Sequence, residues 1–341
     1  MCALPTTPPR IILGTMTFAG QTNQTDATTM IDAFIASPLS GAVAELDTAR
    51  MYGGGKTEDL LGEIFVANPT FVAHTSIASK ANPFKAFNAA WNLSSVGTHD
   101  QLSASLSSLQ CTTLDIFYLH APDPDVNIEE TLHTVQQMFE ANKFKRFALS
   151  NFTAWETTWI VNFMTQKGWV VPTIYQGMMN AVTRKTTEEL IPCLRRLGMA
   201  FYAYNPLAGG MLTGKFTKGA ATGEGRFNAN TPWGKIYQGR FMQDKQFEAM
   251  ELVRQACADC GDVPLPEAAL RWMMHHSGLD GDRGDGIIIG ASTIGHFEAN
   301  MEALTQGPLP AEILAAYDQG WELCRGVCPN FARGVSGSAV V

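Results

Sequence analysis

Residues 115–150 read DIFYLHAPDPDVNIEETLHTVQQMFEANKFKRFALS, and they contain one complete repeat of the chain's dominant pattern. Asp115–His120 is an apolar, β-rich run typical of a buried strand, and Phe144–Ser150 is a second strand-like run. Between them, Ile128–Ala141 has apolar residues at the spacing of an amphipathic helix. The order strand, helix, strand predicts a βαβ unit whose two strands are parallel.

The same alternation continues along the chain in both directions. Eight strand-like runs favour a closed (β/α)8 TIM barrel, and an open doubly wound sheet is the alternative. We expect one domain over residues 1–341, because barrels of this kind exceed the length of most single domains. The other six strand-like runs are Arg10–Gly14, Ala42–Asp47, Phe71–Ala78, Thr173–Gln176, Met199–Tyr204 and Gly286–Gly290.

Helical patterns separate these runs. One segment, Ala208–Asp244, does not follow the alternation of strands and helices: it is Gly-rich and too long for an ordinary connection. Such a segment predicts a functional loop after the seventh strand. The helix expected from Thr187 to Leu197 is followed by Gly198, a residue typical of helix C-termini. The remaining helices are expected at Thr25–Ala36, Glu58–Ala67, His99–Leu109, Trp155–Gln166, Gln246–Ala258, Pro266–His275, His296–Leu304 and Pro310–Arg325.

Composition excludes several classes of protein. Apolar residues make up 45% of the 341 residues and charged residues 16%, which is typical of a globular chain rather than a disordered one. The net charge of -8 argues against a nucleic-acid partner. The sequence has no apolar stretch of membrane-spanning length, and residues 1–5 do not resemble a signal peptide. We therefore expect a cytoplasmic protein without a membrane partner.

The cysteines suggest neither a disulfide framework nor a metal site. There are seven, an odd number in a long chain. Cys257 and Cys260 form a C-x-x-C and Cys324 and Cys328 a C-x-x-x-C, which could indicate zinc. However, the first pair ends a helical run and lacks the turn residues of a zinc knuckle, so we expect reduced thiols and no metal.

Polar residues follow the predicted strands at the ends where a TIM barrel carries its catalytic groups. Taken singly, each has an ordinary explanation: a helix cap, a solvated lysine or a hydrogen-bonded core histidine. Their joint occurrence at the same ends of the strands favours a site. They are Asp47 with Tyr52, Lys80, His120, Ser150 with Asn151, Gln176, Tyr204 with Asn205, and Ser292 with Thr293.

Four of these residues have complementary chemical properties: Asp47, Tyr52, Lys80 and His120. A tyrosine hydroxyl has a reference pKa of about 10, and a nearby ammonium is expected to lower it. Asp47 would hold the Lys80 ammonium, and His120 could donate a hydrogen bond to a carbonyl oxygen. This set could protonate a carbonyl oxygen while a hydride reaches the carbonyl carbon.

These motifs resemble the aldo-keto reductases over about residues 10 to 333. The resemblance is carried by residues 47–58, Lys80, Tyr118–His120, Ser150-Asn151, Gln176 and residues 204–210. Residues 225–227, 237–241 and 328–333 are most similar to the branch of aflatoxin-aldehyde and succinic-semialdehyde reductases. This family uses a TIM barrel and NADPH without a G-x-G-x-x-G motif, and the chain likewise has none after its first strand.

The resemblance implies an NADPH-dependent reductase of aldehydes and reactive ketones, with a small carbonyl compound as substrate. Tyr52 is then the general acid, Asp47 and Lys80 adjust it, and His120 orients the carbonyl. The substrate would contact Met51, His120, Tyr237, Arg240 and Arg333, the last lying in a C-terminal tail over the mouth of the barrel. NADPH or NADP+ would contact Met16, Ser150, Asn151, Gln176, Tyr204, Asn205, Pro206, Leu207, Gly209, Gly210, Gly214, Lys215, Arg226, Ser292, Thr293, His296 and Asn300.

Two other functions share these residues. One is an alcohol dehydrogenase that works mainly in the oxidative direction. The other is an NADP-binding regulatory protein similar to the β-subunits of channels, which has the same barrel and cofactor site. Arg226, Arg240 and the tail from Pro329 to Arg333 favour the reductases. The resemblance also implies a homodimer.

Overall fold

The structure is a computed structural model that describes residues 7–219 and 225–337, and its strands close into a barrel in the order β1 to β8. Neighbouring strands are parallel, and β1 pairs with β8 to complete the ring. The predicted (β/α)8 TIM barrel is confirmed, and the open sheet is excluded. The strands are β1 Arg10–Gly14, β2 Ala44–Asp47, β3 Thr75–Ala81, β4 Leu114–Leu119, β5 Phe144–Ser150, β6 Pro172–Met178, β7 Ala200–Tyr204 and β8 Gly286–Ile289.

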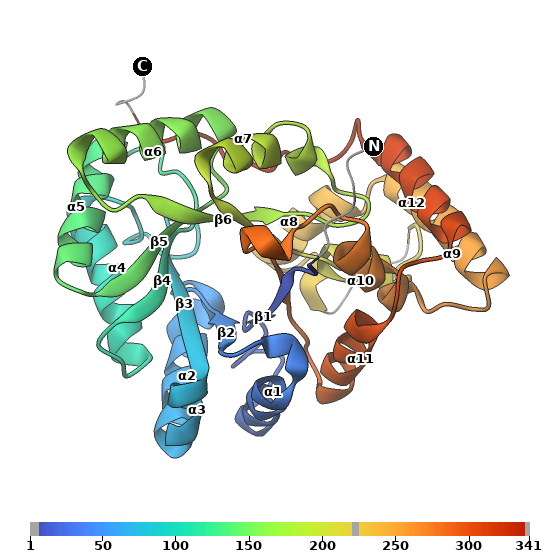
Figure 1. The fold of residues 1–341 in the computed structure, drawn as a ribbon, viewed down its shortest axis with the longest axis horizontal. Coiled ribbons are helices and arrows are strands. Elements are labelled where there is room, and N and C mark those ends of the chain that lie inside the picture. Colours follow the sequence, from blue (N-terminus) through green and yellow to red (C-terminus); the bar gives the residue numbers. More distant parts are fainter. Residues whose placement is uncertain (1–6, 220–224, 338–341) are drawn as a thin grey trace.

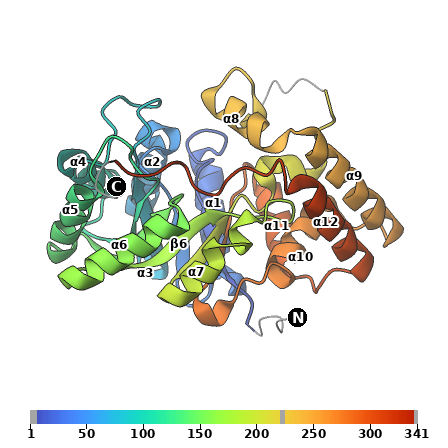
Figure 2. The same ribbon diagram turned by 90° about the horizontal axis from the view of Figure 1, so that it is seen from above.

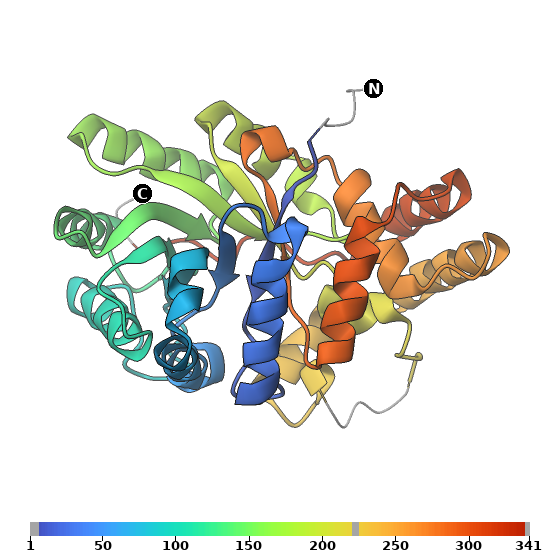
Figure 3. The same ribbon diagram turned by 60° about the horizontal axis from the view of Figure 1, so that its bottom comes forward.

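Helices surround the barrel on its outer side (Figures 1 and 3). In the described ranges, none of them combines the length and apolar character needed to cross a bilayer. The helices are α1 Gln24–Ala36, α2 Lys56–Ala67, α3 Pro69–His74, α4 Ser95–Ser108, α5 Ile128–Glu140, α6 Ala154–Lys167, α7 Leu190–Leu197, α8 Pro232–Phe241, α9 Asp244–Asp259, α10 Leu265–His275, α11 Ile294–Thr305 and α12 Ala311–Cys324.

The core has two parts because the strands are buried on both faces. Between the barrel and the helices lies a large apolar cluster that includes Leu13, Leu46 and Leu119. Inside the barrel, a smaller cluster combines Ala side chains with large ones such as Tyr118 and Tyr202. This alternation of small and large residues fills the interior, so that the barrel is a packed core and not a pore.

Several predicted elements start at a different residue in the structure; for example, the helix expected over His99–Leu109 begins at Ser95. The strand expected over Phe71–Ala78 is wrong in its first half, because Pro69 begins the short helix α3 and the strand starts only at Thr75. The helix expected from Thr187 begins at Leu190, after a separate 3-10 turn at Lys185–Thr187. Gly198 does end that helix, with a φ of 67°.

The long segment after β7 contains more regular structure than expected. It holds two 3-10 turns, Ala208–Thr213 and Gly225–Phe227, and the helix α8. Two glycines among ten residues make α8 a weak helix by propensity, which is why the sequence did not predict it. Its start is marked by Thr231, whose side chain accepts a hydrogen bond from the Gly234 amide.

The C-terminal tail crosses the mouth of the barrel. Figure 2 shows it leaving α12 and passing over the barrel toward α4 and α5. The Arg333 amide donates to the Asn151 carbonyl just after β5, at 2.9 Å. Further on, the Gly337 amide donates to the Asp123 carbonyl after β4, at 2.8 Å. The expected position of the tail is therefore confirmed, and it brings Arg333 to the carboxyl ends of the strands.

Candidate active site

A cavity of about 720 Å³ opens at the carboxyl ends of the strands. Its size is within the range of small-molecule and cofactor sites. Most of the residues expected from the sequence lie in its wall. They are Met16, Asp47, Tyr52, His120, Asn151, Gln176, Tyr204, Asn205, Pro206, Leu207, Gly209, Gly210, Lys215, Arg226, Tyr237, Ser292, Thr293, His296, Asn300 and Arg333.

Five expected residues do not line this cavity. Lys80 is buried behind Asp47, and the Ser150 hydroxyl lies beneath Asn151, from whose amide it accepts a hydrogen bond. Met51 packs in a small apolar cluster with Ala49 and Trp91. Gly214 faces Leu265 and Arg254 instead of the cavity. Arg240 lies near the end of α8, half-buried and beside the charge of Arg333.

Lys80 and Asp47 form a buried ion pair at the base of the cavity. Lys80 Nζ lies 2.7 and 2.8 Å from the two Asp47 oxygens and donates to the Thr48 carbonyl at 2.6 Å. Gln176 Nε2 donates to Asp47 Oδ1 at 2.8 Å. Burial lowers the pKa of Lys80, and the Asp47 carboxylate opposes that change. The three N–H donors of the ammonium are all used, which fixes its position.

Tyr52 stands over this pair, in the 3-10 turn Tyr52–Gly55. Its ring centroid lies 5.4 Å from Lys80 Nζ. No hydrogen bond among the described residues engages its hydroxyl. Its pKa was expected to be lowered by Lys80, but burial and then the Asp47 carboxylate raise it well above 10. Asp47 offsets the Lys80 charge, so the phenol keeps its proton at neutral pH.

His120 follows β4, and its ring meets the ring of Tyr52 edge to face at 6.1 Å. Burial lowers the pKa of His120 well below 6.5, and the charges of Lys80 and Arg333 add to this effect. The imidazole is therefore neutral at pH 7 and can donate one hydrogen bond without acting as an acid. Its Nδ1 atom is buried without a partner in the described chain.

Asn151 and Tyr204 are hydrogen-bonded to each other beside His120. Asn151 adopts a positive φ of 64°, which turns the chain sharply after β5. Its amide nitrogen donates to the His120 carbonyl at 2.7 Å, and its oxygen accepts from the Tyr204 hydroxyl at 2.8 Å. This bond holds the Tyr204 ring in the cavity wall. The predicted contacts of Asn151 and Gln176 with NADPH stay predictions, since both amide nitrogens already bind protein oxygens.

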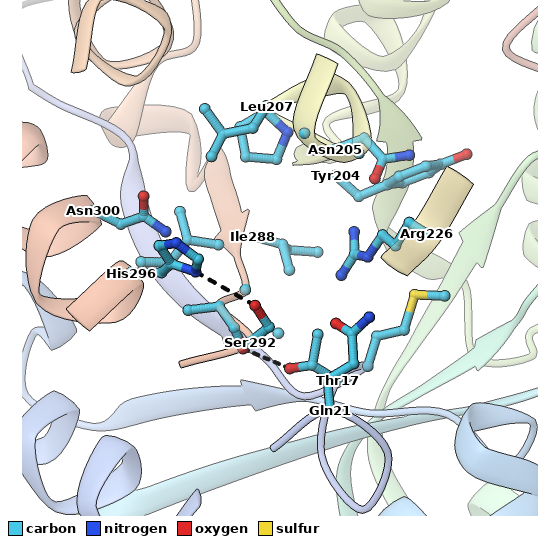
Figure 4. Close-up of a pocket in the computed structure, with 18 of the residues that line it drawn as sticks. Thr17, Gln21, Tyr204, Asn205, Leu207, Arg226, Ile288, Ser292, His296 and Asn300 are labelled. Carbon is cyan, nitrogen blue, oxygen red and sulfur yellow. Dashed lines mark hydrogen bonds between the residues drawn. The ribbon is translucent and has the colours of Figure 1, made fainter. Parts of the chain in front are cut away.

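Three cations line the cavity without a carboxylate partner in the described part of the chain: Lys215, Arg226 and Arg333. The Arg226 guanidinium points into the centre of the pocket (Figure 4) and lies 6.0 Å from the Tyr237 ring. Arg333 lies over the ring of Phe84, 5.6 Å from its centroid. A cavity with such free positive charge is suited to an anionic ligand.

The far end of the cavity is formed by the start of α11. Thr293 caps this helix by accepting a hydrogen bond from the His296 amide. Ser292 Oγ and His296 Nδ1 lie 3.4 Å apart, and Asn300 is one turn further along (Figure 4). Helix N-termini favour anions through their free N–H groups and dipole. Polar side chains at this point are suited to a phosphate or sugar.

Comparison with known proteins agrees with this geometry. The sequence model of the Aldo/keto reductase family matches residues 10–322. This chain belongs to the aldo-keto reductase family. It is 41% identical to Aflatoxin B1 aldehyde reductase member 2 of Rattus norvegicus over 331 residues, 95% of this chain and 88% of that protein. It is 39% identical to Aflatoxin B1 aldehyde reductase member 4 of Homo sapiens, over 95% of this chain and 97% of the relative.

A more distant relative is Aldo-keto reductase pigE of Monascus ruber, 31% identical over 91% of each chain. The resemblance inferred from the sequence motifs is thus confirmed. The chain is an oxidoreductase that acts on carbonyl groups. Aldo-keto reductases use a nicotinamide cofactor, and the cavity fits one: it is long enough to join Tyr52 to α11, and its free cations suit phosphate groups.

Sequence reasoning missed several wall residues. Thr17 and Gln21 lie after β1, and the Thr17 hydroxyl donates to the Ala291 carbonyl at 2.6 Å. Ile288 reaches the cavity from inside the barrel. The apolar residues were indistinguishable from core residues in the sequence. The polar ones follow β1 within a few residues, so the rule about strand ends would have found them.

Proposed function

We propose that the chain is an NADPH-dependent reductase that converts aldehydes and reactive ketones to alcohols. One observation carries this proposal. A protonated Tyr52 and a neutral His120 face the same cavity as Lys215 and Arg226, whose charges are free within the described chain. This arrangement supplies a proton donor, a group that orients the carbonyl, and cations for the phosphates of a cofactor that would supply the hydride.

In the proposed mechanism the carbonyl oxygen lies between Tyr52 and His120. His120 donates a hydrogen bond that orients and polarises the carbonyl group. Bound NADPH supplies the hydride to the carbonyl carbon. Tyr52 gives its hydroxyl proton to the oxygen as negative charge develops there, and water restores that proton after the product leaves. Lys80 and Asp47 keep a fixed charge pair beside the phenol.

The proposal is tested by adding 4-nitrobenzaldehyde to the protein and NADPH and following the absorbance of NADPH. We expect continuous consumption of NADPH over many turnovers. A regulatory NADP-binding protein would consume at most one equivalent per cavity. Loss of only that first equivalent, or no loss, would show that the chain is not a reductase of this kind.

NADPH is expected to be preferred over NADH. Lys215 and Arg226 lie along the cavity, and Ser292 and Thr293 can donate to a 2′-phosphate at the N-terminus of α11. Hydrogen bonds to a charged group contribute about 1.5–3 kcal/mol, or roughly ten- to a hundred-fold in affinity. The measurement is kcat/KM for each cofactor with one aldehyde. Equal values would contradict the assignment of this end of the cavity to the 2′-phosphate.

Arg333 and Arg240 are expected to favour substrates that carry a carboxylate. Arg333 lines the cavity, and the guanidinium group of Arg240 lies close enough to Arg333 for its pKa to be lowered by that charge as well as by burial. A carboxylate between two such groups would relieve their repulsion. Planar guanidinium groups also bind carboxylates through paired hydrogen bonds.

Replacing Arg333 by methionine should lower kcat/KM for succinic semialdehyde roughly ten- to a hundred-fold more than for 4-nitrobenzaldehyde. Arg240→Met should show the same selectivity to a smaller degree, since Arg240 is outside the cavity wall. The neutral aldehyde serves as the internal control. An equal loss with both substrates would mean that the arginines support the tail or the cofactor and do not bind the carboxylate.

A further inference from the structure

The turn that carries Tyr52 is unusual in its backbone. Gly53, Gly54 and Gly55 follow Tyr52 directly, with φ values of 58°, 68° and 102°. Glycine adopts such angles without strain, but it also has the largest conformational freedom to lose on folding. Three in succession would leave Tyr52 poorly fixed unless another group holds the turn. The Tyr52 hydroxyl gives no such support, since it has no hydrogen bond in the described chain. The Tyr52 and Gly54 amides donate only to the nearby Ala49 and Met51 carbonyls.

The Arg50 side chain packs against this turn at Gly55. A Cβ atom built on Gly55 would lie 2.0 Å from Arg50 Nη2, so the guanidinium occupies the space that a side chain would fill there. Arg50 Nη1 lies 2.7 Å from Glu58 Oε2 in α2 and 3.0 Å from Ser108 Oγ in α4. The side chain thus joins the turn to two helices.

The Glu58 end of this ion pair is completely buried, whereas 17% of the Arg50 side chain is exposed. Its second oxygen, Oε1, accepts from the Ser79 hydroxyl at 2.5 Å. Ser79 precedes Lys80 on β3, and the negative charge of Glu58 helps to keep the Lys80 ammonium charged. The network of Arg50, Glu58 and Ser79 therefore connects the Tyr52 turn to the strand that carries Lys80.

From this geometry we propose that Arg50 is a positioning residue: it holds the triple-glycine turn so that the Tyr52 hydroxyl stays aligned for proton transfer. The inference rests on the proposed role of Tyr52 as the acid. Arg50 does not line the cavity, so it acts on the reaction through its neighbours, which are the turn and the Glu58–Ser79 pair beside Lys80. A misplacement of about 1 Å can cost up to about a hundred-fold in rate, which sets the scale of the effect.

The test compares Arg50→Met, Tyr52→Phe and the double variant in steady-state reduction of 4-nitrobenzaldehyde. Arg50→Met should lower kcat between about ten- and a hundred-fold while KM for NADPH stays nearly unchanged. Arg50→Lys should recover part of the loss, since an ammonium can still pair with Glu58. In the Tyr52→Phe background, Arg50→Met should cause no further loss, because no proton donor remains to be aligned.

Arg195→Met is the matched control. Arg195 forms an ion pair with Asp285 of similar exposure, 19% and 0%, at the opposite end of the barrel. Both variants should lower the urea midpoint of unfolding, but only Arg50→Met should lower kcat. An equal loss of kcat in the two variants, or an additive loss in the double variant, would overturn the positioning role. Full activity of Tyr52→Phe itself would instead refute the proposed function.

Discussion

Tyr52→Phe is expected to lower kcat for aldehyde reduction by about 10²–10⁴-fold, the usual range for loss of a general acid. The substitution keeps the ring against His120 and removes only the hydroxyl. NADPH binding, measured by fluorescence, should stay within a few-fold of the parent protein. A variant that keeps more than about a tenth of the activity would show that another group donates the proton.

The pH dependence of this reaction follows from the same geometry. Burial and Asp47 raise the pKa of Tyr52 well above 10, so the phenol is not depleted of its proton between pH 7 and pH 9. Burial, Lys80 and Arg333 lower the pKa of His120, so it stays neutral at and below pH 7. The parent protein should therefore not lose its proton donor in this range.

Lys80→Met is expected to have the largest effect on stability. It leaves the Asp47 carboxylate buried without its cation, and breaking a buried ion pair in this way typically costs about 3–5 kcal/mol of unfolding free energy. Gln176 would remain as one hydrogen-bond donor to Asp47, which does not replace a charge. Urea denaturation at pH 7 measures the change. The rate of reduction should also fall, since Tyr52 loses the ammonium beside its ring.

Lys85→Met is the control for this experiment. Lys85 pairs with Asp125 at the surface, where 46% and 63% of the side chains are exposed. Water screens such a pair, so its removal should change stability little. Equal destabilisation by the two substitutions would contradict the view that the Lys80–Asp47 pair affects the free energy of unfolding because it is buried.

Much of the barrel could be predicted from the sequence because its strands are buried on both faces. Phe144–Ser150 was predicted with its correct bounds, although Lys145 and Arg146 interrupt its apolar residues, because it fits the alternation of strands and helices. The predicted elements are wrong where local chemistry and the hydrophobic pattern disagree. Phe71 is apolar and buried, yet Pro69 turns its segment into a helix. Helix α8 was not predicted because its two glycines lower its helix propensity.

The site was predictable to the extent that it depends on strand ends. Asp47, His120 and Gln176 meet there because parallel strands bring their carboxyl ends together. The direction of the Tyr52 pKa shift could not be predicted in the same way. It depends on how completely the Asp47 charge offsets the Lys80 charge and on how deeply the Tyr52 ring is buried. Both depend on the tertiary structure. The support of the turn by Arg50 depends likewise on contacts with α2 and α4.

The proposed reaction requires that a proton and a hydride reach the same carbonyl group in this cavity. The most direct measurement is the amount of 4-nitrobenzyl alcohol formed from 4-nitrobenzaldehyde per NADPH consumed, determined by chromatography for the parent protein and Tyr52→Phe. We expect equal amounts of alcohol and oxidised cofactor in the parent protein, and very little of either in the variant. NADPH consumption without alcohol, or the same alcohol yield from both proteins at equal rates, would contradict the proposed reaction.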